Sequence, residues 1–443
     1  MYSRIYIRFN KCVRGTFHIS VKSECPQQAS GEGGFPGAEV PAKINGHARL
    51  QRGGECRAQG HGRRFVLQRK FGCVPGIIQR MENKLHSIGS GKESARDALA
   101  ALRHEISVWG SELGFDAVRV ADVDLSSAEA GLQAWLQAGF HGEMDYMGKH
   151  GTKRTRPAEL VPNTCRVISA RMSYLPDAAD ALENLRDGSR AYVSRYALGR
   201  DYHKVLRARL QQLASRIAAS SPHGYRVFVD SAPVMEVELA GRAGLGWRGK
   251  HSLLIDRSVG SMFFLGEIYT DLPLAVDAPV QEHCGSCRAC LDACPTGAIV
   301  APYRVDARLC ISYLTIELRG AIPVPLRKML GNRVYGCDDC QLVCPWNRFA
   351  RLSKEGDFAV RNGLDQATLA ELFHWSEADF NERMAGSAIY RVGYERWLRN
   401  LAVGLGNAQP SASVLGALGS RREDRSELVR DHVVWALSEH MGR

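Results

Sequence analysis

Eight of the 13 cysteines in this chain of 443 residues fall in or near two runs that each end in Cys-Pro. The first run is C-G-S-C-R-A-C-L-D-A-C-P, in which Cys284, Cys287, Cys290 and Cys294 are separated by two, two and three residues. In ferredoxins this spacing places three thiolates around one [4Fe–4S] cluster and turns the fourth toward a neighbouring cluster. The run therefore predicts iron–sulfur chemistry and the transfer of single electrons.

The second run has the same ending but lacks its first cysteine. It holds Cys337, Cys340 and Cys344, and Cys310 lies upstream as a displaced replacement. Eight cysteines in this arrangement predict two [4Fe–4S] clusters. A pair of zinc sites is the alternative, but zinc sites usually take two separated pairs of ligands and do not account for the first run.

Crossed ligation follows from the spacing, because the last cysteine of each run is turned toward the other cluster. The first cluster is predicted to take Cys284, Cys287, Cys290 and Cys344, and the second to take Cys294, Cys310, Cys337 and Cys340. These runs occupy a small part of the chain. We therefore expect the remainder to hold the group that receives the electrons.

Bulk properties narrow the class of protein. The length predicts about three domains, and a hydrophobic share of 45% is that of a soluble globular protein. No apolar run reaches the roughly 18 residues of a membrane span, so no membrane partner is expected. Cysteines committed to clusters rather than disulfides indicate a reducing compartment, and we expect a cytoplasmic protein.

The net charge of +11 is concentrated at the N-terminus. Residues 1–80 hold 14 Lys or Arg and 4 Glu, so the rest of the chain is nearly neutral. A polyanionic partner would therefore have to be met by local basic patches. Residues 1–80 lack helical or strand periodicity, and we predict them to be disordered. A transit peptide and a twin-arginine signal at Arg63 and Arg64 are alternatives, but an upstream extension of a protein that starts at Met81 is favoured.

Helices and strands alternate over the next 180 residues or so, which predicts an α/β (α+β) layer domain at residues 81–275. Apolar runs predict strands at residues 117–120, 166–170, 225–229, 252–255 and 262–268. A ferredoxin-like domain is expected at residues 276–350. A helical segment follows at residues 351–443.

Two apolar stripes mark that helical segment. One consists of Trp397, Leu398, Leu401 and Leu405, and the other of Leu428, Val434 and Leu437. Two such helices resemble a single HEAT-type pair. One pair cannot bury its own apolar face, so we expect it to dock on the body of the protein.

Polar residues next to these elements are candidates for chemistry. Asp230 follows a predicted strand, where α/β folds display catalytic groups; the alternative is that Asp230 or Ser231 caps the next helix. Asp201 is expected to cap a helix, and residues 200–204 are polar enough to line a pocket. The stretch G-L-G-W-R-G-K-H at residues 244–251 lies in the wrong order for dinucleotide binding. We interpret it as a turn that lets the backbone approach a large flat ligand.

Several long motifs together make the chain resemble a known family. These are V-D-S-A-P-V-M-E, A-G-L-G-W-R-G-K-H, the first cysteine run, C-I-S-Y-L-T-I-E and Y-G-C-D-D-C-Q-L-V-C-P-W-N. In this order, over residues 95–443, the chain resembles tRNA epoxyqueuosine reductases. That family is similar in core to the corrinoid reductive dehalogenases. The resemblance implies cobalamin, bound base-off between an α/β domain and a two-cluster domain.

The resemblance also implies an activity and partners. It implies reduction of epoxyqueuosine to queuosine at the tRNA wobble position, the last step of queuosine biosynthesis, on tRNAs of the Tyr, His, Asp and Asn type. A histidine ligand to cobalt is not expected, because D-x-H-x-x-G, opened by Asp201 and His203, has Leu206 in place of its glycine. We expect a monomer and an unidentified reductant.

Site residues follow from the resemblance as expectations. Asp230 matches the proposed proton donor, which requires burial under the corrin to raise its pKa. Arg154, Lys250, Ser252 and Ser312 match positions that line the cofactor or lie beside it. We expect phosphate contacts from the C-terminal cations Arg391, Arg396 and Arg399. A reductive dehalogenase acting on a small haloorganic compound is the alternative, and a pure electron-transfer protein would not need about 300 further patterned residues.

Overall fold

The computed structural model describes residues 5–10, 18–23, 48–50, 56–58 and 96–442. It divides into two compact units, Met1–Ile88 and Gly89–Arg443. In the first unit, β1 (Ile5–Asn10) pairs antiparallel with β2 (His18–Ser23), and β3 (Ala48–Leu50) with β4 (Cys56–Ala58). No strand was expected there. The rest of the segment predicted to be disordered lies outside the described residues.

Four strands form the central sheet of the second unit: β5 (Ala117–Ala121), β6 (Arg166–Ser173), β8 (Tyr225–Phe228) and β11 (Phe263–Thr270). Their order is β5-β6-β11-β8, and every neighbouring pair is antiparallel. The four strands predicted in these places are confirmed. The antiparallel pairing makes this an α+β layer rather than the parallel sheet of doubly wound proteins.

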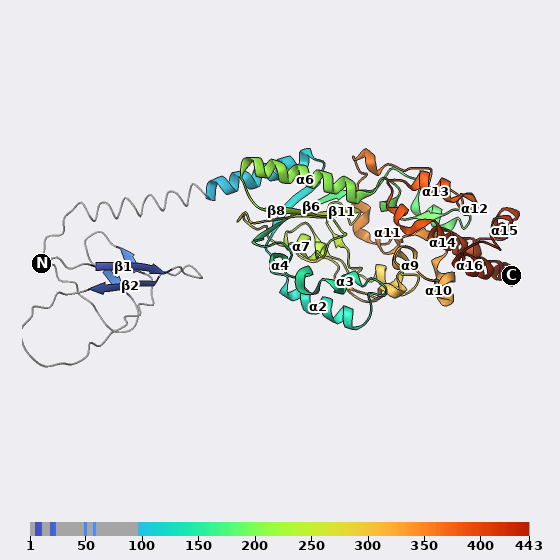
Figure 1. Ribbon diagram of the computed structural model, residues 1–443, viewed down its shortest axis with the longest axis horizontal. Helices are drawn as coiled ribbons and strands as arrows, with labels where there is room; N and C mark the ends of the chain where they lie inside the picture. The colour runs from blue at the N-terminus through green and yellow to red at the C-terminus, as the bar shows by residue number, and fades with distance from the viewer. Residues whose placement is uncertain (1–4, 11–17, 24–47, 51–55, 59–95, 443) are drawn as a thin grey trace, which may run out of the picture. The chain divides into compact units, whose positions relative to one another are not determined.

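Helices cover both faces of this sheet (Figure 1). On one face lie a helix at residues 96–112 and α6 (Tyr202–Ser220), whose Leu206 and Leu210 are fully buried. On the other face α7 (Glu236–Arg242) packs through Leu239. Alternate residues of each strand belong to the cores on the two faces of the sheet, because successive side chains of a strand point to opposite faces. Asp201 caps α6 as predicted: its carboxylate accepts the backbone N–H of His203 at 3.2 Å.

Short elements connect these layers. The helices are α2 (Ser126–Gln137), α3 (Tyr146–Lys149), α4 (Pro157–Leu160) and α5 (Ala181–Arg186), with 3-10 turns η1 (Gly151–Arg154) and η2 (Arg195–Ala197). Two pairs of short strands are β9 (Trp247–Arg248) with β10 (Leu254–Ile255), and β7 (Tyr192–Val193) with β14 (Arg333–Tyr335). The second pair ties the sheet domain to the segment that carries the second cysteine run.

The glycine-rich stretch before β10 packs closely against other parts of the chain. A Cβ on Gly246 would lie 2.3 Å from the carbonyl oxygen of Ile255, and one on Gly244 would lie 2.3 Å from that of Ala278. Gly244 also has a φ of +75°, which favours glycine. The glycines therefore allow close contacts within the chain itself, and the interpretation that the turn lets the backbone approach a flat ligand stays a prediction.

The cysteine runs surround short helices. Elements of this region are α8 (Ala289–Asp292), β12 (Ile299–Ala301), β13 (Arg304–Val305), η3 (Ala307–Leu309), α9 (Ile311–Ile316), α10 (Val324–Leu330), α11 (Asp339–Leu342) and η4 (Pro345–Phe349). Helices α8 and α11 pack against each other. This contact brings the end of each cysteine run next to the start of the other.

The C-terminal part is helical, as predicted. It comprises η5 (Gly356–Phe358), α12 (Leu369–His374), α13 (Glu377–Met384), η6 (Ala388–Val392), α14 (Gly393–Asn407), α15 (Ala412–Gly419) and α16 (Glu427–Met441). The stripe around Trp397 on α14 is buried. The stripe predicted for α16 is wrong at one position: Val434 is 56% exposed, whereas Leu437 packs against the core and Val429 and Val433 are buried. Among the described residues, no helix is long and apolar enough to span a membrane.

Arg399 corrects one of the expected RNA contacts. It lies on α14, is fully buried, and donates to the carbonyl oxygens of Leu318 and Gly320 at 2.7 Å and of Leu314 at 2.8 Å. Burial lowers its pKa to about 9. A side chain enclosed in this way cannot reach a phosphate, so the prediction of a tRNA contact at Arg399 is wrong; it joins α14 to the loop after α9.

Replacing Arg399 should therefore affect stability. In Arg399→Ala the three carbonyl oxygens lose their donor, and we expect the free energy of unfolding to fall by about 3 kcal/mol or more. Chemical denaturation monitored by circular dichroism measures this loss. The matched control is Arg422→Ala on the exposed surface, which should change stability by less than about 0.5 kcal/mol. Undiminished stability of Arg399→Ala, with a selective loss of RNA affinity, would contradict the assignment.

Candidate functional site: two cysteine groups and a polar cavity wall

The eight cysteines of the two runs gather in two places. Four of them line a small cavity together with Lys250, His251 and Trp346; these are Cys284, Cys287, Cys290 and Cys344. Lys250 holds the first loop in place, because its Nζ donates to the carbonyl oxygens of Gly285 and Cys287 at 2.6 and 2.8 Å. We refer to this place as the small cysteine cavity.

The other four cysteines line a large cavity of about 520 Å³; these are Cys294, Cys310, Cys337 and Cys340. Its opposite wall belongs to the sheet domain and includes Leu254, Phe263, Phe264 and Asp230. The lining of the large cavity thus combines thiols with apolar side chains and a few carboxyl groups, Asp230 among them. Such a wall suits a large, mostly apolar ligand with a few polar groups.

A buried aspartate positions the second cysteine loop. Asp338 is enclosed, and its carboxylate accepts hydrogen bonds from Tyr192 Oη at 2.8 Å, Ser194 Oγ at 2.5 Å and the Arg195 backbone N–H at 2.8 Å. These donors come from the β7–η2 segment of the sheet domain. The loop between Cys337 and Cys340 is therefore fixed against that domain and lines the cavity between them.

An adjoining cavity of about 520 Å³ shares several lining residues with the large one, including Tyr202, Asp230, Cys310 and Ser312. It extends toward the C-terminal helices, where Arg391 and Arg396 line it. Asp230 therefore stands where the two cavities meet. A group bound in the large cavity and a substrate bound in the adjoining cavity would both be close to this carboxylate.

Asp230 has an unusual backbone conformation and two side-chain partners. Its φ is +46°, a left-handed conformation that Asp and Asn tolerate better than most residues. The Tyr202 hydroxyl donates to Oδ2, and His203 Nε2 lies 3.0 Å from the same oxygen. Its backbone N–H donates to Glu236 Oε1 at 2.6 Å. Asp230 does not cap α7, whose N-cap is Met235.

These partners reverse the expected effect of burial on Asp230. Burial acts to raise its pKa, but the hydrogen bonds from His203 and Tyr202 and the positive charges of His203 and Arg391 lower it overall. The raised pKa was predicted for Asp230 beneath a bound corrin and stays a prediction; the groups of the chain itself lower this pKa. The physical reason is that the carboxylate receives two hydrogen bonds from α6, which stabilise its charged form.

His203 is the titratable partner of Asp230, and Arg391 also lies 2.8 Å from its Nδ1. Its two ring nitrogens lie between two carboxylates, with Nδ1 2.9 Å from Asp201 Oδ1 and Nε2 3.0 Å from Asp230 Oδ2. Burial acts to lower the pKa of His203, but the hydrogen bonds to Asp201 and Asp230 raise it overall. The arrangement is a histidine–carboxylate pair at the wall of the adjoining cavity, and such a pair can pass a proton to a bound group.

The remaining predicted cofactor residues lie in different places. Ser312 lines both the large and the adjoining cavities, and Lys250 lines the small cysteine cavity. Arg154 is buried beside the Asp230 loop, where it donates to Val234 O at 3.3 Å and Tyr146 O at 3.3 Å. Ser252 lines none of these three cavities and has a φ of +72° within a tight turn.

The side chains of the two remaining C-terminal cations, Arg391 and Arg396, already donate hydrogen bonds to protein groups. Arg391 donates to Asp201 Oδ1 at 2.6 Å, and Arg396 donates to the carbonyl oxygens of Val392 and Ile316 at 2.7 and 2.9 Å. Arg319, in contrast, is exposed and lines the adjoining cavity. Sequence reasoning did not single out Arg319, and nothing in its local pattern distinguishes it from other surface arginines.

Two further carboxyl groups were also missed. Glu236 ends the motif V-D-S-A-P-V-M-E, and the sequence analysis assigned it no role. In the structure it lines the large cavity. Glu267 is fully buried on β11. A charged residue within the apolar run M-F-F-L-G-E-I-Y was a usable signal, because carboxylates are rarely buried without a reason.

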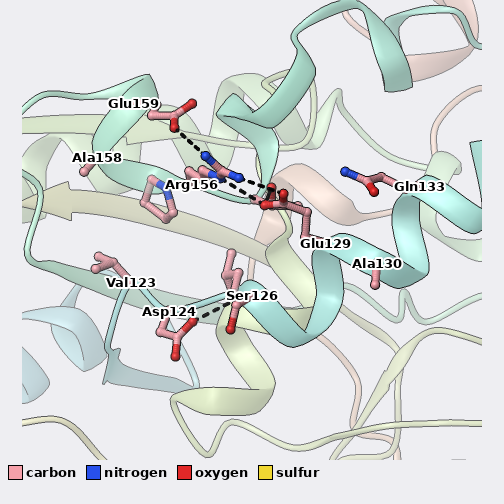
Figure 2. Close-up of a pocket in the computed structure, with 12 residues that line it drawn as sticks. Val123, Asp124, Ser126, Glu129, Ala130, Gln133, Arg156, Ala158 and Glu159 are labelled. Atoms are coloured by element: carbon pink, nitrogen blue, oxygen red, sulfur yellow. Dashed lines mark hydrogen bonds and ion pairs between the residues drawn. The ribbon is translucent and has the colours of Figure 1, made fainter.

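A separate hollow of about 500 Å³ lies between the start of α2 and α4 (Figure 2). Arg156 projects between Glu129 and Glu159 and pairs with them at 3.0 and 3.2 Å. Thr155 Oγ1 also donates to Glu129, at 2.7 Å. These charged groups satisfy one another, and the hollow shares no described lining residue with the cysteine cavities, so we assign no chemistry to it.

Comparison with known proteins agrees with this geometry. Residues 283–347 match the family described as "4Fe-4S double cluster binding domain", and residues 154–231 match "Epoxyqueuosine reductase QueG, DUF1730". The epoxyqueuosine reductase of Pseudomonas aeruginosa is 62% identical over 343 residues, which are 77% of this chain and 95% of that protein. The chain belongs to the epoxyqueuosine reductase family. The family member of Burkholderia pseudomallei is 60% identical, over 76% of this chain and 92% of its own.

A solved structure of the family extends the likeness to the fold. It is a crystal structure of epoxyqueuosine reductase with an epoxyqueuosine-modified tRNA-Tyr stem loop, 28% identical, with a TM-score of 0.71 over 77% of this chain and 91% of that chain. The predicted family is thereby confirmed, and the mixed helix and sheet fold with a double-cluster domain agrees with it. Membership favours an epoxyqueuosine reductase over the dehalogenase alternative and over a pure electron-transfer protein.

Proposed function

We propose that this chain reduces epoxyqueuosine to queuosine at the wobble position of tRNA. One observation carries the proposal: the large cavity is lined by cysteines and by Asp230, and the partner of Asp230, His203, lines the adjoining cavity. Conversion of an epoxide to an alkene consumes two electrons and two protons and releases water. The cysteine wall supports the supply of electrons, and the Asp230 wall supports the supply of protons.

We assign the clusters by the two cysteine groups. The small cysteine cavity would hold one [4Fe–4S] cluster, and the thiols of the large cavity would hold the other. When bound, the clusters would supply single electrons. Cys287 of the first group is exposed, whereas the second group faces the large cavity. This arrangement favours entry of electrons at the first group from a reductant in solution.

The large cavity fits the expected cobalamin. Leu254, Phe263 and Phe264 offer an apolar face, and Ser312 and Asp230 offer polar groups. Reduced cobalt in a corrin supplies a nucleophile that attacks carbon, which is the chemistry needed to open an epoxide. His251 also borders the cavity, and its Nε2 has no described partner. The prediction of base-off binding without a histidine ligand rested on His203 alone.

We propose that Asp230 delivers the proton held by His203. The pair lies at the junction of the two cavities, and Tyr202 fixes the same carboxylate oxygen. When the epoxide opens, its oxygen becomes an alkoxide that must be protonated. Asp230 would pass it a proton and be reprotonated from His203 Nε2. Arg154 would keep the Asp230 loop in place through the carbonyl oxygen of Val234.

The substrate side is proposed to be the adjoining cavity. A nucleotide extruded from the anticodon loop would enter it, and nearby phosphates would meet exposed cations. Arg319 is the best placed of these, because it lines both the adjoining cavity and a groove between α13, α14 and α16. Arg391 and Arg396 would act mainly by shaping the cavity, since their donors are bound to protein groups.

The test is anaerobic conversion of epoxyqueuosine-containing tRNA by the full chain, purified after feeding cobalamin and supplied with a chemical reductant. Formation of queuosine that requires corrin would support the proposal. Conversion by corrin-free protein would remove cobalamin from it. Absence of conversion, with turnover of a small haloorganic compound instead, would support the dehalogenase alternative.

A chain that starts at Met81 should keep the activity. All the site residues named above lie in the second compact unit, which begins at Gly89. We expect this shortened chain to fold, bind both cofactors and turn over normally. Iron content, corrin spectrum and tRNA affinity measure the outcome. Loss of tRNA affinity on truncation would show instead that the basic N-terminal segment is a nucleic-acid arm.

A further inference from the structure

Glu267 is a carboxyl group without any visible means of stabilising a charge. It lies in the middle of β11 between Ser169 of β6 and Phe228 of β8, and it is fully buried. Among the described residues, the only hydrogen-bond partner of its carboxyl group is the carboxyl group of Glu236. A buried carboxylate without a cation or donor is too costly to persist, so Glu267 is a neutral carboxylic acid.

Glu236 connects this buried acid to the large cavity. It is the first residue of α7, and its side chain is partly buried and lines the cavity. Its Oε1 accepts the backbone N–H of Asp230 at 2.6 Å, and its carboxyl group interacts with that of Glu267. The hydrogen bond to Asp230 accounts for the position of Glu236 but gives no reason for a second carboxyl group behind it.

The surroundings keep protons on both groups. Burial and the negative charge of Asp230 raise the pKa of Glu236 to about 8, and burial with the charge of Glu236 raises the pKa of Glu267 further above its ordinary value. The charged and titratable groups that act on Glu236 are Asp230 from the loop, Tyr202 and His203 from α6, Glu267 and Tyr269 from β11, and Arg154 from η1. Two carboxyl groups this close cannot both ionise at neutral pH.

We propose that Glu236 and Glu267 form a proton reservoir and that Glu236 releases a proton into the large cavity during epoxide reduction. The inference rests on the proposed function, which consumes two protons in each turnover. The His203–Asp230 pair supplies one of them. Glu236 is a second catalytic acid at the same cavity wall, and Glu267 is a positioning residue that acts through it.

The step balances in protons and charge. The O–H bond of Glu236 breaks, and an O–H bond forms on the oxygen that leaves the epoxide as water. Glu236 is left as a carboxylate beside Asp230, where repulsion between the two charges favours prompt reprotonation. Water that enters the cavity after turnover can return the proton to Glu236, while Glu267 stays protonated beside it. The two electrons come from the one-electron reductant of the established family activity and do not pass through these groups.

The first test is spectroscopic and needs no substrate. The infrared carbonyl band of a protonated carboxylic acid should be present at neutral pH in the folded chain with its cofactors. Part of this band should titrate near pH 8 and be missing in Glu236→Gln, and a second part should be missing in Glu267→Gln. Absence of any acid band that disappears in these two variants would overturn the proposal.

The second test is kinetic. Glutamine keeps the acceptor for the Asp230 N–H but carries no transferable proton, so single-turnover conversion by Glu236→Gln should fall by about 100-fold. In Glu236→Ala, added acetic acid should restore part of the rate, which a merely structural role would not allow. Conversion by Glu236→Gln within threefold of the wild type would overturn the proposal.

The matched control is Glu238→Gln, two residues further along α7. Glu238 pairs with Arg248 at 2.8 Å and is not part of the cavity wall, so this variant should convert substrate at the wild-type rate. The control also separates two kinds of failure. If wild type and Glu238→Gln both leave epoxyqueuosine unchanged, the proposed function fails, whereas the infrared bands still decide the protonation of Glu236 and Glu267.

Discussion

Replacing Asp230 by Asn should lower single-turnover conversion of epoxyqueuosine-containing tRNA by about 100-fold or more. Asparagine retains the size of the side chain and tolerates the left-handed φ of +46° at this position. It also still accepts a hydrogen bond from Tyr202. What it loses is the ability to pass on the proton held by His203, whose Nε2 lies 3.0 Å from Asp230 Oδ2.

The measurement is conversion under chemical reduction, with iron content and corrin binding determined on the same preparation. Both should stay near the wild-type values, since no cysteine is touched. Asp357→Asn is a suitable control, because Asp357 forms an exposed pair with Arg200 at 3.2 Å and lines neither cavity. Near-normal conversion by Asp230→Asn with intact cofactors would remove Asp230 from the mechanism.

Replacing Cys344 by Ser should damage the same cluster as replacing Cys284, although 60 positions separate them in the chain. Both thiols line the small cysteine cavity. Each variant should lose about four of eight irons and the same component of the electron paramagnetic resonance spectrum. Cys294→Ser should instead share its defect with Cys340→Ser, although Cys294 belongs to the first run.

Cys165→Ser is the matched control for these variants. Cys165 lies in neither cysteine group, and its Sγ donates to the carbonyl oxygen of Asp271 at 3.2 Å. It should retain both clusters. If Cys344→Ser lost the spectral component that Cys337→Ser loses, ligation would follow the order of the chain and the crossed assignment would be abandoned.

Several features of the site were predictable because their physical cause is local. The spacing of Cys284, Cys287 and Cys290 follows from the reach of a few residues around one cluster. Asp201 was identified as a cap because a cap bonds to the backbone two residues onward. The strands of the central sheet were found from runs of apolar residues, since a strand covered on both faces needs such runs.

Other features depend on residues that are far apart in the chain. The stripe on α16 was misplaced because the neighbours of Val434 and Val433 decide which of them is buried. The cation Arg399 was taken for a surface residue, yet carbonyl oxygens from α9 and from the loop after it enclose its guanidinium group. The spacing of charges along a helix does not reveal what lies opposite to it.

The sequence by itself determined the cysteine groups, the family and the position of Asp230 after a strand. Only the tertiary structure decided how that carboxylate is protonated. Its pKa depends on Tyr202 and His203 from α6, on Glu236 from α7 and, behind it, on Glu267 from β11. Electrostatic interactions act through space over a few ångströms, so the charge state of a residue is set by whichever elements the fold brings beside it.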